Sequence, residues 1–244
     1  MNAYPNISAV ASLVADPSRA IFLEALLDGR ALPAGELAYM AGVTPQTASS
    51  HLAKLVEGGL LVVEQQGRHR YYRLAGKEVA FLIETMGSIA APVQVRSLKQ
   101  SDQLQHLSFA RTCYGHLAGK LGISLCEALL RDGYLEEPED EHAKDYHITE
   151  KGIQWFTSFG IILEVKAGSR RAMARKCLDW SERRHHISGV LGDELGRRLS
   201  ELDWTRQKAG SRSVEVTEAG KKGLYECWAF HCRVTIRYSC TLAK

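Results

Sequence analysis

The chain has 244 residues, of which 24% are charged and 45% are hydrophobic, with only six prolines. This composition is typical of a globular protein with one large domain or two smaller ones, and it excludes disorder, collagen and a coiled-coil rod. The formal net charge is only +3, from 31 basic and 28 acidic residues. Any affinity for nucleic acid must therefore come from charge clustered on one face.

Targeting signals are not expected. No apolar run approaches the roughly 20 residues of a membrane-spanning helix, and residues 1–14 lack the basic flank and cleavage site of a signal peptide. We therefore expect a cytoplasmic protein with no membrane partner. The six cysteines all follow Arg111 and are too irregularly spaced for a disulfide scaffold. We expect them to be buried small side chains unless a site recruits them.

The first 57 residues predict a helix-turn-helix. Apolar residues recur at three- and four-residue steps over 7–27, with a break at Asp16-Pro17-Ser18, which predicts two helices. Residues 33–42 predict a short helix that ends at Gly42, and Thr44-Pro45 begins the next one. A short helix, a tight turn and a second helix form this motif.

The second helix of that motif, residues 44–57, is amphipathic. Ala48, Leu52 and Leu55 share a buried face, and the opposite face is short, polar and almost uncharged. Amide and hydroxyl groups suit base edges in a DNA major groove, and Lys54 suits a phosphate. The alternative is an ordinary surface helix, which is also polar on its outer side.

A β-hairpin is expected after this helix. Gly58-Gly59 leads into an apolar strand, and residues 71–74 predict a second strand beyond a turn at Gly67. The tip between them carries Arg68, His69 and Arg70. A hairpin of this kind directly after a helix-turn-helix is typical of a wing that contacts the DNA backbone or minor groove.

Three segments together resemble the ArsR-type family of bacterial winged-helix repressors: DPSR at 16–19, TPQTASSHLAKL at 44–55 and GRHRYYRL at 67–74. The resemblance covers roughly the first 95 residues and implies a homodimer on a palindromic operator. With the pattern above, it gives the expected DNA contacts as Thr44, Gln46, Thr47, Ser49, Ser50, His51, Lys54, Arg68, His69 and Arg70. It also implies a dimer seam formed by residues 7–14 and a later helix with Val79, Leu82, Ile83, Met86 and Ile89. The alternative for that stripe is the core of a monomer.

The chain departs from the metal-sensing members of this family. Those members carry thiolates on the helix before the recognition helix, or His and carboxylate ligands on the dimer helix. Here residues 35–41 contain no Cys or His, and residues 77–91 contain no His. We expect no metal or cofactor at these positions, and any receptor should lie in the roughly 140 additional residues.

The additional residues contain a duplication. HLAGKLG at 116–122 returns as HISGVLG at 186–192, and ITEKG at 148–152 returns as VTEAG at 216–220. Each unit of about 60 residues predicts a helix, a turn, a short strand and a helix capped by Thr149 or Thr217. Because the acidic run 136–141 would repel phosphate, we expect these units to bind a ligand or support a dimer.

The predicted fold class is mainly α with small β wings (α+β), a winged helix-turn-helix followed by two degenerate winged-helix-like repeats. The predicted domains are residues 1–95 for DNA binding and dimerisation, 106–168 for the first repeat, and 169–244 for a basic helix and the second repeat. The basic helix is expected over 170–186, as a second phosphate patch or part of a pocket at a domain junction.

Four interpretations apply to the predicted regulatory region. The favoured one is an apolar cavity for an organic effector, lined by Tyr134, Trp155, Trp180 and Trp204. The second is a thiol switch at Cys113 or Cys177, with Cys113 and His116 on one helix face and the thiol pKa lowered by imidazolium. The third is metal ligation by Cys113, His116, Cys177 and His185, although no compact ligand motif is present. The last is packing alone. Because Cys113 and Cys177 stand at different offsets from His116 and His186, the duplication is not expected to make them equivalent.

The sequence therefore predicts a DNA-binding repressor that is modulated by a small molecule. An enzyme is not expected, because the pair Cys113 and His116 has no third orienting residue and no oxyanion motif. A protein-interaction module of degenerate winged helices would account for residues 106–230, but it would not account for Arg68 and Arg70.

Overall fold

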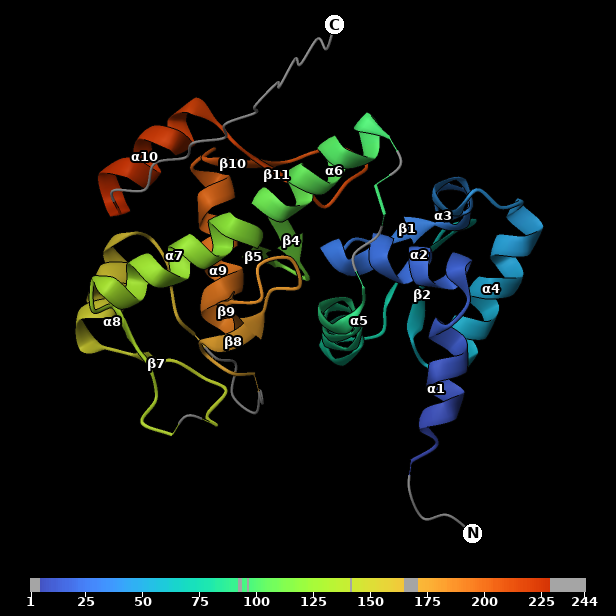
Figure 1. The fold of residues 1–244 in the computed structure, drawn as a ribbon, viewed down its shortest axis with the longest axis horizontal. Helices are drawn as coiled ribbons and strands as arrows, with labels where there is room; N and C mark the ends of the chain where they lie inside the picture. Colours follow the sequence, from blue (N-terminus) through green and yellow to red (C-terminus); the bar gives the residue numbers. More distant parts are fainter. Residues whose placement is uncertain (1–4, 92–93, 96, 141, 165–170, 229–244) are drawn as a thin grey trace, which may run out of the picture.

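The computed structural model describes residues 5–91, 94–95, 97–140, 142–164 and 171–228. An N-terminal part and a C-terminal part lie side by side, and helix α5 lies where they meet (Figure 1). The structure is mainly helical with small antiparallel sheets, which confirms the predicted fold class. Among the described helices, none has the length and apolar character that a bilayer span requires. The end of the third predicted domain, residues 229–244, lies outside the described residues.

The N-terminal part is a winged helix-turn-helix. Its elements are α1 (Ile7–Val14), α2 (Pro17–Ala25), η1 (Leu26–Asp28), β1 (Leu32–Pro33), α3 (Ala34–Ala41), α4 (Pro45–Glu57), β2 (Leu61–Gln66), β3 (His69–Leu74) and α5 (Lys77–Ile89). The sheet order is β1-β3-β2, all antiparallel. The short strand β1 was not predicted, and it pairs Leu32 with Tyr72 at the base of the wing.

Local signals set the helix ends as the sequence predicts. The Asp16 carboxylate accepts a hydrogen bond from the Arg19 amide at 3.0 Å and so begins α2. Gly42 ends α3 in the left-handed conformation, with φ of +65°. Two residues later, Thr44 Oγ1 accepts from the Thr47 amide at 3.2 Å and begins α4. The helices then enclose a core that includes Phe22, Leu23, Leu26, Leu37, Leu52, Leu55, Leu61 and Leu74.

The C-terminal part begins with α6 (Leu98–Phe109) and then repeats one order of elements, hairpin, helix, hairpin, helix. The first copy is β4 (Arg111–Cys113), β5 (His116–Ala118), α7 (Gly119–Arg131), β6 (Leu135–Glu136), β7 (His147–Ile148) and α8 (Glu150–Ser158). The second is β8 (Arg175–Leu178), β9 (His185–Ser188), α9 (Gly189–Glu201), β10 (Thr205–Gln207), β11 (Val214–Val216) and α10 (Glu218–Trp228). One continuous core joins both copies, through the leucines of α7 and α9.

Equivalent contacts recur in the two copies. Thr149 Oγ1 accepts from the Gly152 amide at 2.9 Å, and Thr217 Oγ1 accepts from the Gly220 amide at 2.9 Å. A Cβ atom at Gly152 or at Gly220 would lie 2.1 Å from the carbonyl oxygen of Tyr134 or Trp204, respectively. Glycine is therefore required at both positions, because the preceding hairpin approaches each helix too closely for a side chain.

The predicted basic helix over 170–186 is wrong. Its described part forms the β8–β9 hairpin, in which Cys177 pairs with His186. Within β8, Cys177 is buried and Lys176 is half-buried, while Arg175 and Leu178 are exposed. The many basic residues of this segment made it look like a solvated helix.

The expected helix face with Cys113 and His116 is also wrong. The two residues pair across the β4–β5 hairpin, and the two-residue turn between them is formed by Tyr114 (φ +47°) and Gly115 (φ +107°). Positive φ at both central residues is what a type I′ hairpin turn requires.

The N-terminal and C-terminal parts contact each other through η1 and α5. The Tyr114 amide donates to the Leu27 carbonyl at 2.7 Å. Glu84 of α5 is 3% exposed, forms an ion pair with Arg212 and lies 3.9 Å from Arg111. Since a buried carboxylate is costly unless it is paired, these arginines hold α5 against the C-terminal part.

Candidate functional site

The outer face of α4 is polar and open to solvent. Its buried residues are Ala48, Leu52 and Leu55, as predicted. The exposed residues are Thr44, Gln46, Thr47, Ser49, Ser50 and Lys54. Three of the hydroxyls also bond locally: Thr44 caps the helix, Thr47 Oγ1 is hydrogen-bonded to Thr44 Oγ1 at 2.9 Å, and Ser49 Oγ donates to the Pro45 carbonyl at 2.8 Å. The remaining polar groups on this face are available to a ligand that lies along it.

His51 differs from the other expected contacts, because its ring is turned into the protein. Its Nδ1 lies 3.4 Å from Arg19 Nη1 and 3.8 Å from the Asp16 carboxylate. The ring also packs edge-on against Phe22, with centroids 6.4 Å apart. The structure thus gives His51 a role in fixing α4 against α2.

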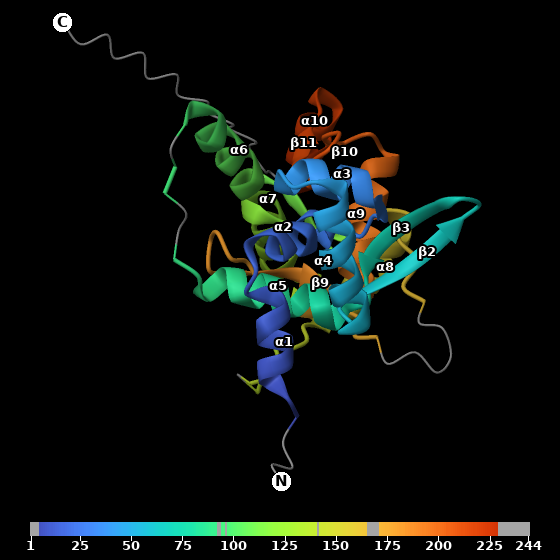
Figure 2. The same ribbon diagram turned by 90° about the vertical axis from the view of Figure 1, so that its right-hand side faces the viewer.

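The β2–β3 hairpin projects beyond α4, as Figure 2 shows. All residues from Gln65 to Arg70 are exposed, including Arg68, His69 and Arg70. Among the described residues, no hydrogen-bond or ion-pair partner is found for the side chain of Arg68 or of Arg70. Nearer the base, Arg73 and Glu64 pair across the strands and stabilise the hairpin. Two unpaired cations therefore stand beside the polar face of α4, an arrangement suited to a phosphate backbone.

The expected cavity between aromatic side chains is not what these residues form. Trp155 stacks on Tyr134 and on Phe159, with ring centroids 4.9 and 4.8 Å apart, and Trp204 packs on Phe159 at 5.7 Å. These rings fill the core between the two repeats. Trp180 lies elsewhere, with the Arg111 guanidinium 4.5 Å from its ring. The aromatic content predicted an apolar interior correctly but not a hollow one.

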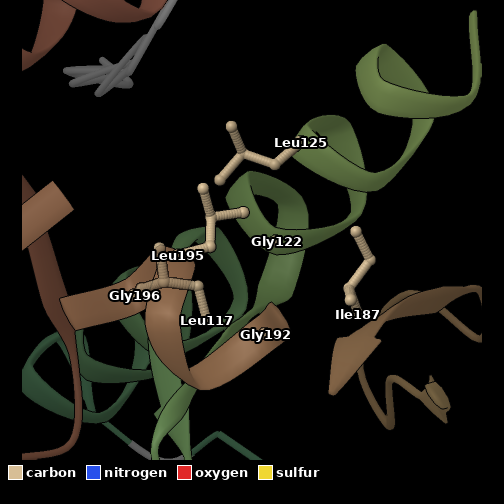
Figure 3. A pocket seen from close by; sticks show the side chains of 7 residues that line it. All are labelled: Leu117, Gly122, Leu125, Ile187, Gly192, Leu195 and Gly196. Atoms are coloured by element: carbon tan, nitrogen blue, oxygen red, sulfur yellow. The ribbon is translucent and has the colours of Figure 1, made fainter. Parts of the chain in front are cut away.

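A small cavity lies where the two repeats cross. It is enclosed mainly by apolar side chains and glycines of β5, α7, β9 and α9, which Figure 3 labels. Its volume is about 10 Å³. This is about the space of one water molecule, so an organic effector does not fit.

A second pocket, of about 560 Å³, lies between α5 and the two hairpins β4–β5 and β8–β9. Its lining combines apolar groups such as Phe81 with charged groups such as Lys77 and Arg175. A volume of this order is typical of sites for small organic molecules. Three of the predicted sensor residues, Cys113, His116 and Cys177, line this pocket.

Four buried residues form a compact cluster at the inner wall of this pocket. They are Cys113, His116, Cys177 and His186, and their candidate ligand atoms all lie within 4.8 Å of one another. The prediction named His185, which is exposed and lies on the other side of the strand. The repeat alignment of HLAGKLG with HISGVLG was the signal for His186, because it makes that residue the equivalent of His116.

The expected non-equivalence of the two cysteines is wrong. Cys113 pairs with His116 across one hairpin, and Cys177 pairs with His186 across the other. The hairpin turns differ in length while the strand register is the same, so a count of residues along the chain gave unequal offsets. The two Cys–His pairs are structural equivalents.

The pKa of Cys113 is shifted in the opposite direction to the one expected for a reactive thiol. A hydrogen bond with Cys177, together with burial, raises the pKa of the Cys113 thiol to about 12. At neutral pH it is therefore a thiol and not a thiolate. Close by, burial alone would raise the pKa of Asp179, but the nearby His186 ring and the charge of Arg111 hold it below its usual range.

Comparisons with known proteins agree with this architecture. A helix-turn-helix domain family matches residues 14–64. The chain is 46% identical over 217 residues to the HTH-type transcriptional regulator YdfF of Bacillus subtilis (strain 168), covering 89% of this chain and 94% of that protein. It is 43% identical over 67 residues to the HTH-type transcriptional regulator CmtR of Mycobacterium bovis, covering 28% of this chain and 56% of that protein.

A similar solved structure is the homodimeric winged helix-turn-helix DNA-binding domain of Mb0332 from Mycobacterium bovis, described as a possible ArsR-family transcriptional regulator. It is 28% identical, covers 35% of this chain and 86% of that chain, and has a TM-score of 0.31. The similarity to YdfF extends well beyond the winged helix, so the repeats are shared with that regulator. The chain belongs to the family of helix-turn-helix transcriptional regulators that includes YdfF.

Proposed function

We propose that this regulator is a homodimeric repressor that binds a palindromic operator and responds to a small organic effector. The observation that carries the proposal is the polar face of α4 lying beside a wing whose arginines have no partner among the described residues. Gln46, Thr47, Ser49 and Ser50 would contact base edges, and Thr44 and Lys54 would contact phosphates. Arg68, His69 and Arg70 would follow the adjacent backbone or minor groove.

The homodimer is supported by uncovered apolar side chains on α1 and α5. Ile7 is 75% exposed and Ile89 is 79% exposed. The opposite face of α5, with Ala80, Glu84 and Ser88, is already buried. A second copy of the chain would cover the apolar side of α5 and place two recognition helices about 34 Å apart, in successive major grooves.

The effector site is proposed at the pocket of about 560 Å³ and not at the aromatic core. One wall of this pocket is α5 and the other is formed by the two hairpins, so an occupant contacts both the dimer helix and the repeats. An effector changes operator affinity only if it binds the two dimer geometries unequally. A hundredfold change requires about 2.7 kcal/mol of coupling.

The test is binding of the purified chain to DNA from its own upstream region, across a salt series, with the stoichiometry measured by sedimentation. We expect affinity to fall steeply with salt and two chains to bind each duplex. Binding of a single chain would contradict the homodimer. The absence of binding at every salt concentration would contradict operator recognition.

A further inference from the structure

The four-residue cluster of Cys113, His116, Cys177 and His186 has the composition and spacing of a metal site. The two thiols and two imidazoles come from four different strands. Cys113 is 3% exposed, His116 and Cys177 are each 7% exposed, and His186 is 0% exposed. Both cysteines are free, so no disulfide accounts for their proximity. The nitrogens His116 Nε2 and His186 Nε2 lie 3.2 Å apart.

These distances fit one tetrahedral ion. Zinc binds sulfur at about 2.3 Å and nitrogen at about 2.0–2.1 Å, so two nitrogens on one zinc ion lie about 3.3 Å apart. The observed separation of the two imidazole nitrogens is nearly this value. The ligand atoms of all four residues fall within 4.8 Å, so no large rearrangement is needed for them to reach a common centre.

A carboxylate lies near the Nδ1 atom of each imidazole. His116 Nδ1 lies 3.7 Å from Asp193 Oδ1, and His186 Nδ1 lies 3.5 Å from Asp179 Oδ2. A carboxylate at Nδ1 favours the tautomer in which Nε2 is free to bind a metal, and metal-binding histidines usually have such a partner. His186 Nδ1 and Asp193 Oδ1 are both buried without a hydrogen bond, so a slight rotation of either ring toward its carboxylate would satisfy them.

Asp179 is itself fixed in place. It accepts hydrogen bonds from Arg111 Nη2 at 2.9 Å and from the Gly119 amide at 2.6 Å, while Ser181 Oγ donates to its other oxygen at 2.7 Å. A carboxylate held this firmly orients the His186 ring before any ion arrives. Such an outer set of contacts is what a preformed site requires.

The duplication places the cluster between the two repeats. A Cβ atom at Gly192 would lie 3.2 Å from His116 Cβ, and one at Gly122 would lie 3.5 Å from His186 Cβ. Each histidine therefore lies against a glycine in the helix of the opposite repeat. The site exists only when both repeats are packed together.

We propose that Cys113, His116, Cys177 and His186 bind one zinc-like divalent cation in a tetrahedral site that ties the two repeats together. The ion is held by two thiolates and two neutral imidazoles, and two thiol protons leave to solvent, so the charge of the ion is balanced. Sulfur and imidazole ligands select zinc and other thiophilic ions over magnesium or calcium. Four protein ligands leave no open position, so the site is not catalytic.

An entry path is present, because Cys113, His116 and Cys177 line the pocket beside α5. The proposed ion would therefore sit at the inner wall of that pocket. The site is also distinct from the metal positions that the family resemblance implies, since those lie on helices of the N-terminal part. A failure of metal binding would not contradict operator binding or the organic effector, and their failure would not contradict metal binding.

The test uses the full chain, reduced and stripped by a chelator, with Cys227, Cys232 and Cys240 replaced by serine so that these three thiols do not contribute. Titration with Co²⁺ should give one ion per chain, with the visible absorption of tetrahedral cobalt and a thiolate-to-cobalt charge-transfer band. Added Zn²⁺ should abolish both signals. An octahedral cobalt spectrum, or no charge-transfer band in the folded reduced chain, would overturn the proposal.

Variants assign the ligands. Cys177→Ser and His186→Gln should each weaken Co²⁺ binding at least a hundredfold, whereas Cys126→Ser, which removes a buried thiol outside the cluster, should bind like the parent chain. Equal binding by Cys177→Ser and Cys126→Ser would contradict the assignment. If a variant fails to fold, the cobalt spectrum of the parent chain still decides the question. Formation of a Cys113–Cys177 disulfide, with no metal binding by the reduced chain, would favour a thiol switch instead.

Discussion

His116 and His186 are 70 residues apart in the chain, and their Nε2 atoms are 3.2 Å apart in the fold. Their rings are tilted by 34°, with centroids at 5.1 Å. The two residues hold the same position in the two copies of the duplicated unit. The C-terminal part is therefore built around a contact between equivalent residues, and the hairpins β4–β5 and β8–β9 bring together a cluster that neither repeat can form alone.

The first prediction concerns the close approach at Gly152 and Gly220. Alanine at either position should destabilise the chain by about 1–3 kcal/mol, because the added methyl would collide with a backbone carbonyl. Gly35→Ala is the control, since no atom lies within 4 Å of the added methyl and α3 should gain about 0.4–1 kcal/mol. Urea unfolding measures all three. Unchanged stability in Gly152→Ala and Gly220→Ala would show that the two hairpins do not pack this closely.

The second prediction is a pH dependence at the start of α2. The Arg19 amide donates to Asp16 and lowers the pKa of that carboxyl below its usual 3.8. Because the folded pKa is the lower one, the stabilisation is complete above the unfolded value and is lost as pH falls through the folded value. Asp16→Ala should cost about 1 kcal/mol at pH 7. The difference in unfolding free energy between Asp16→Ala and the parent chain, measured by urea unfolding, should shrink below pH 4. Asp16→Asn should keep most of the stabilisation by the cap at pH 7 and below pH 4.

The third prediction separates a DNA contact from a positioning residue on α4. Lys54→Ala should leave the urea midpoint unchanged, weaken binding to all sequences alike and reduce the salt slope by about 0.9. His51→Ala should instead lower the urea midpoint, because His51 packs on Phe22 and contacts Arg19. A His51→Ala variant of normal stability with weakened DNA binding would make His51 a direct contact.

The fourth prediction concerns the dimer seam. Ile7→Glu together with Ile89→Glu should convert the proposed dimer to a monomer in sedimentation, because each charge would be buried at the proposed apolar contact. Ile153→Glu is a control for the replacement of an exposed isoleucine by glutamate, since Ile153 is 50% exposed on α8 and lies in the C-terminal part. Monomers in both samples, or dimers in both, would mean that α1 and α5 do not form the seam.

The sequence predicted the winged helix well because its signals are local. Each signal determines a helix cap or a turn within a few residues of itself. The structure confirms the predicted cap or turn at Asp16, Gly42, Thr44 and Gly67. These signals place the polar face of α4 and the wing without any knowledge of distant contacts.

The buried cluster was harder to predict because it depends on pairing between distant strands. Only the strand register decides whether His185 or His186 faces Cys177, and a run of basic residues concealed the strand pattern. The aromatic residues were ambiguous for a different reason. Tryptophans that fill a core and tryptophans that line a cavity have the same spacing, and only packing distinguishes them.

The central claim, that the wing reads DNA, is tested most directly by the double variant Arg68→Glu and Arg70→Glu. Its affinity for DNA from the upstream region should be measured by fluorescence anisotropy beside a control of equal charge change, Lys221→Glu with Lys222→Glu, on α10. We expect the wing variant to lose about a hundredfold in affinity and the control to bind like the parent chain. Equal affinities for the two variants would contradict the account.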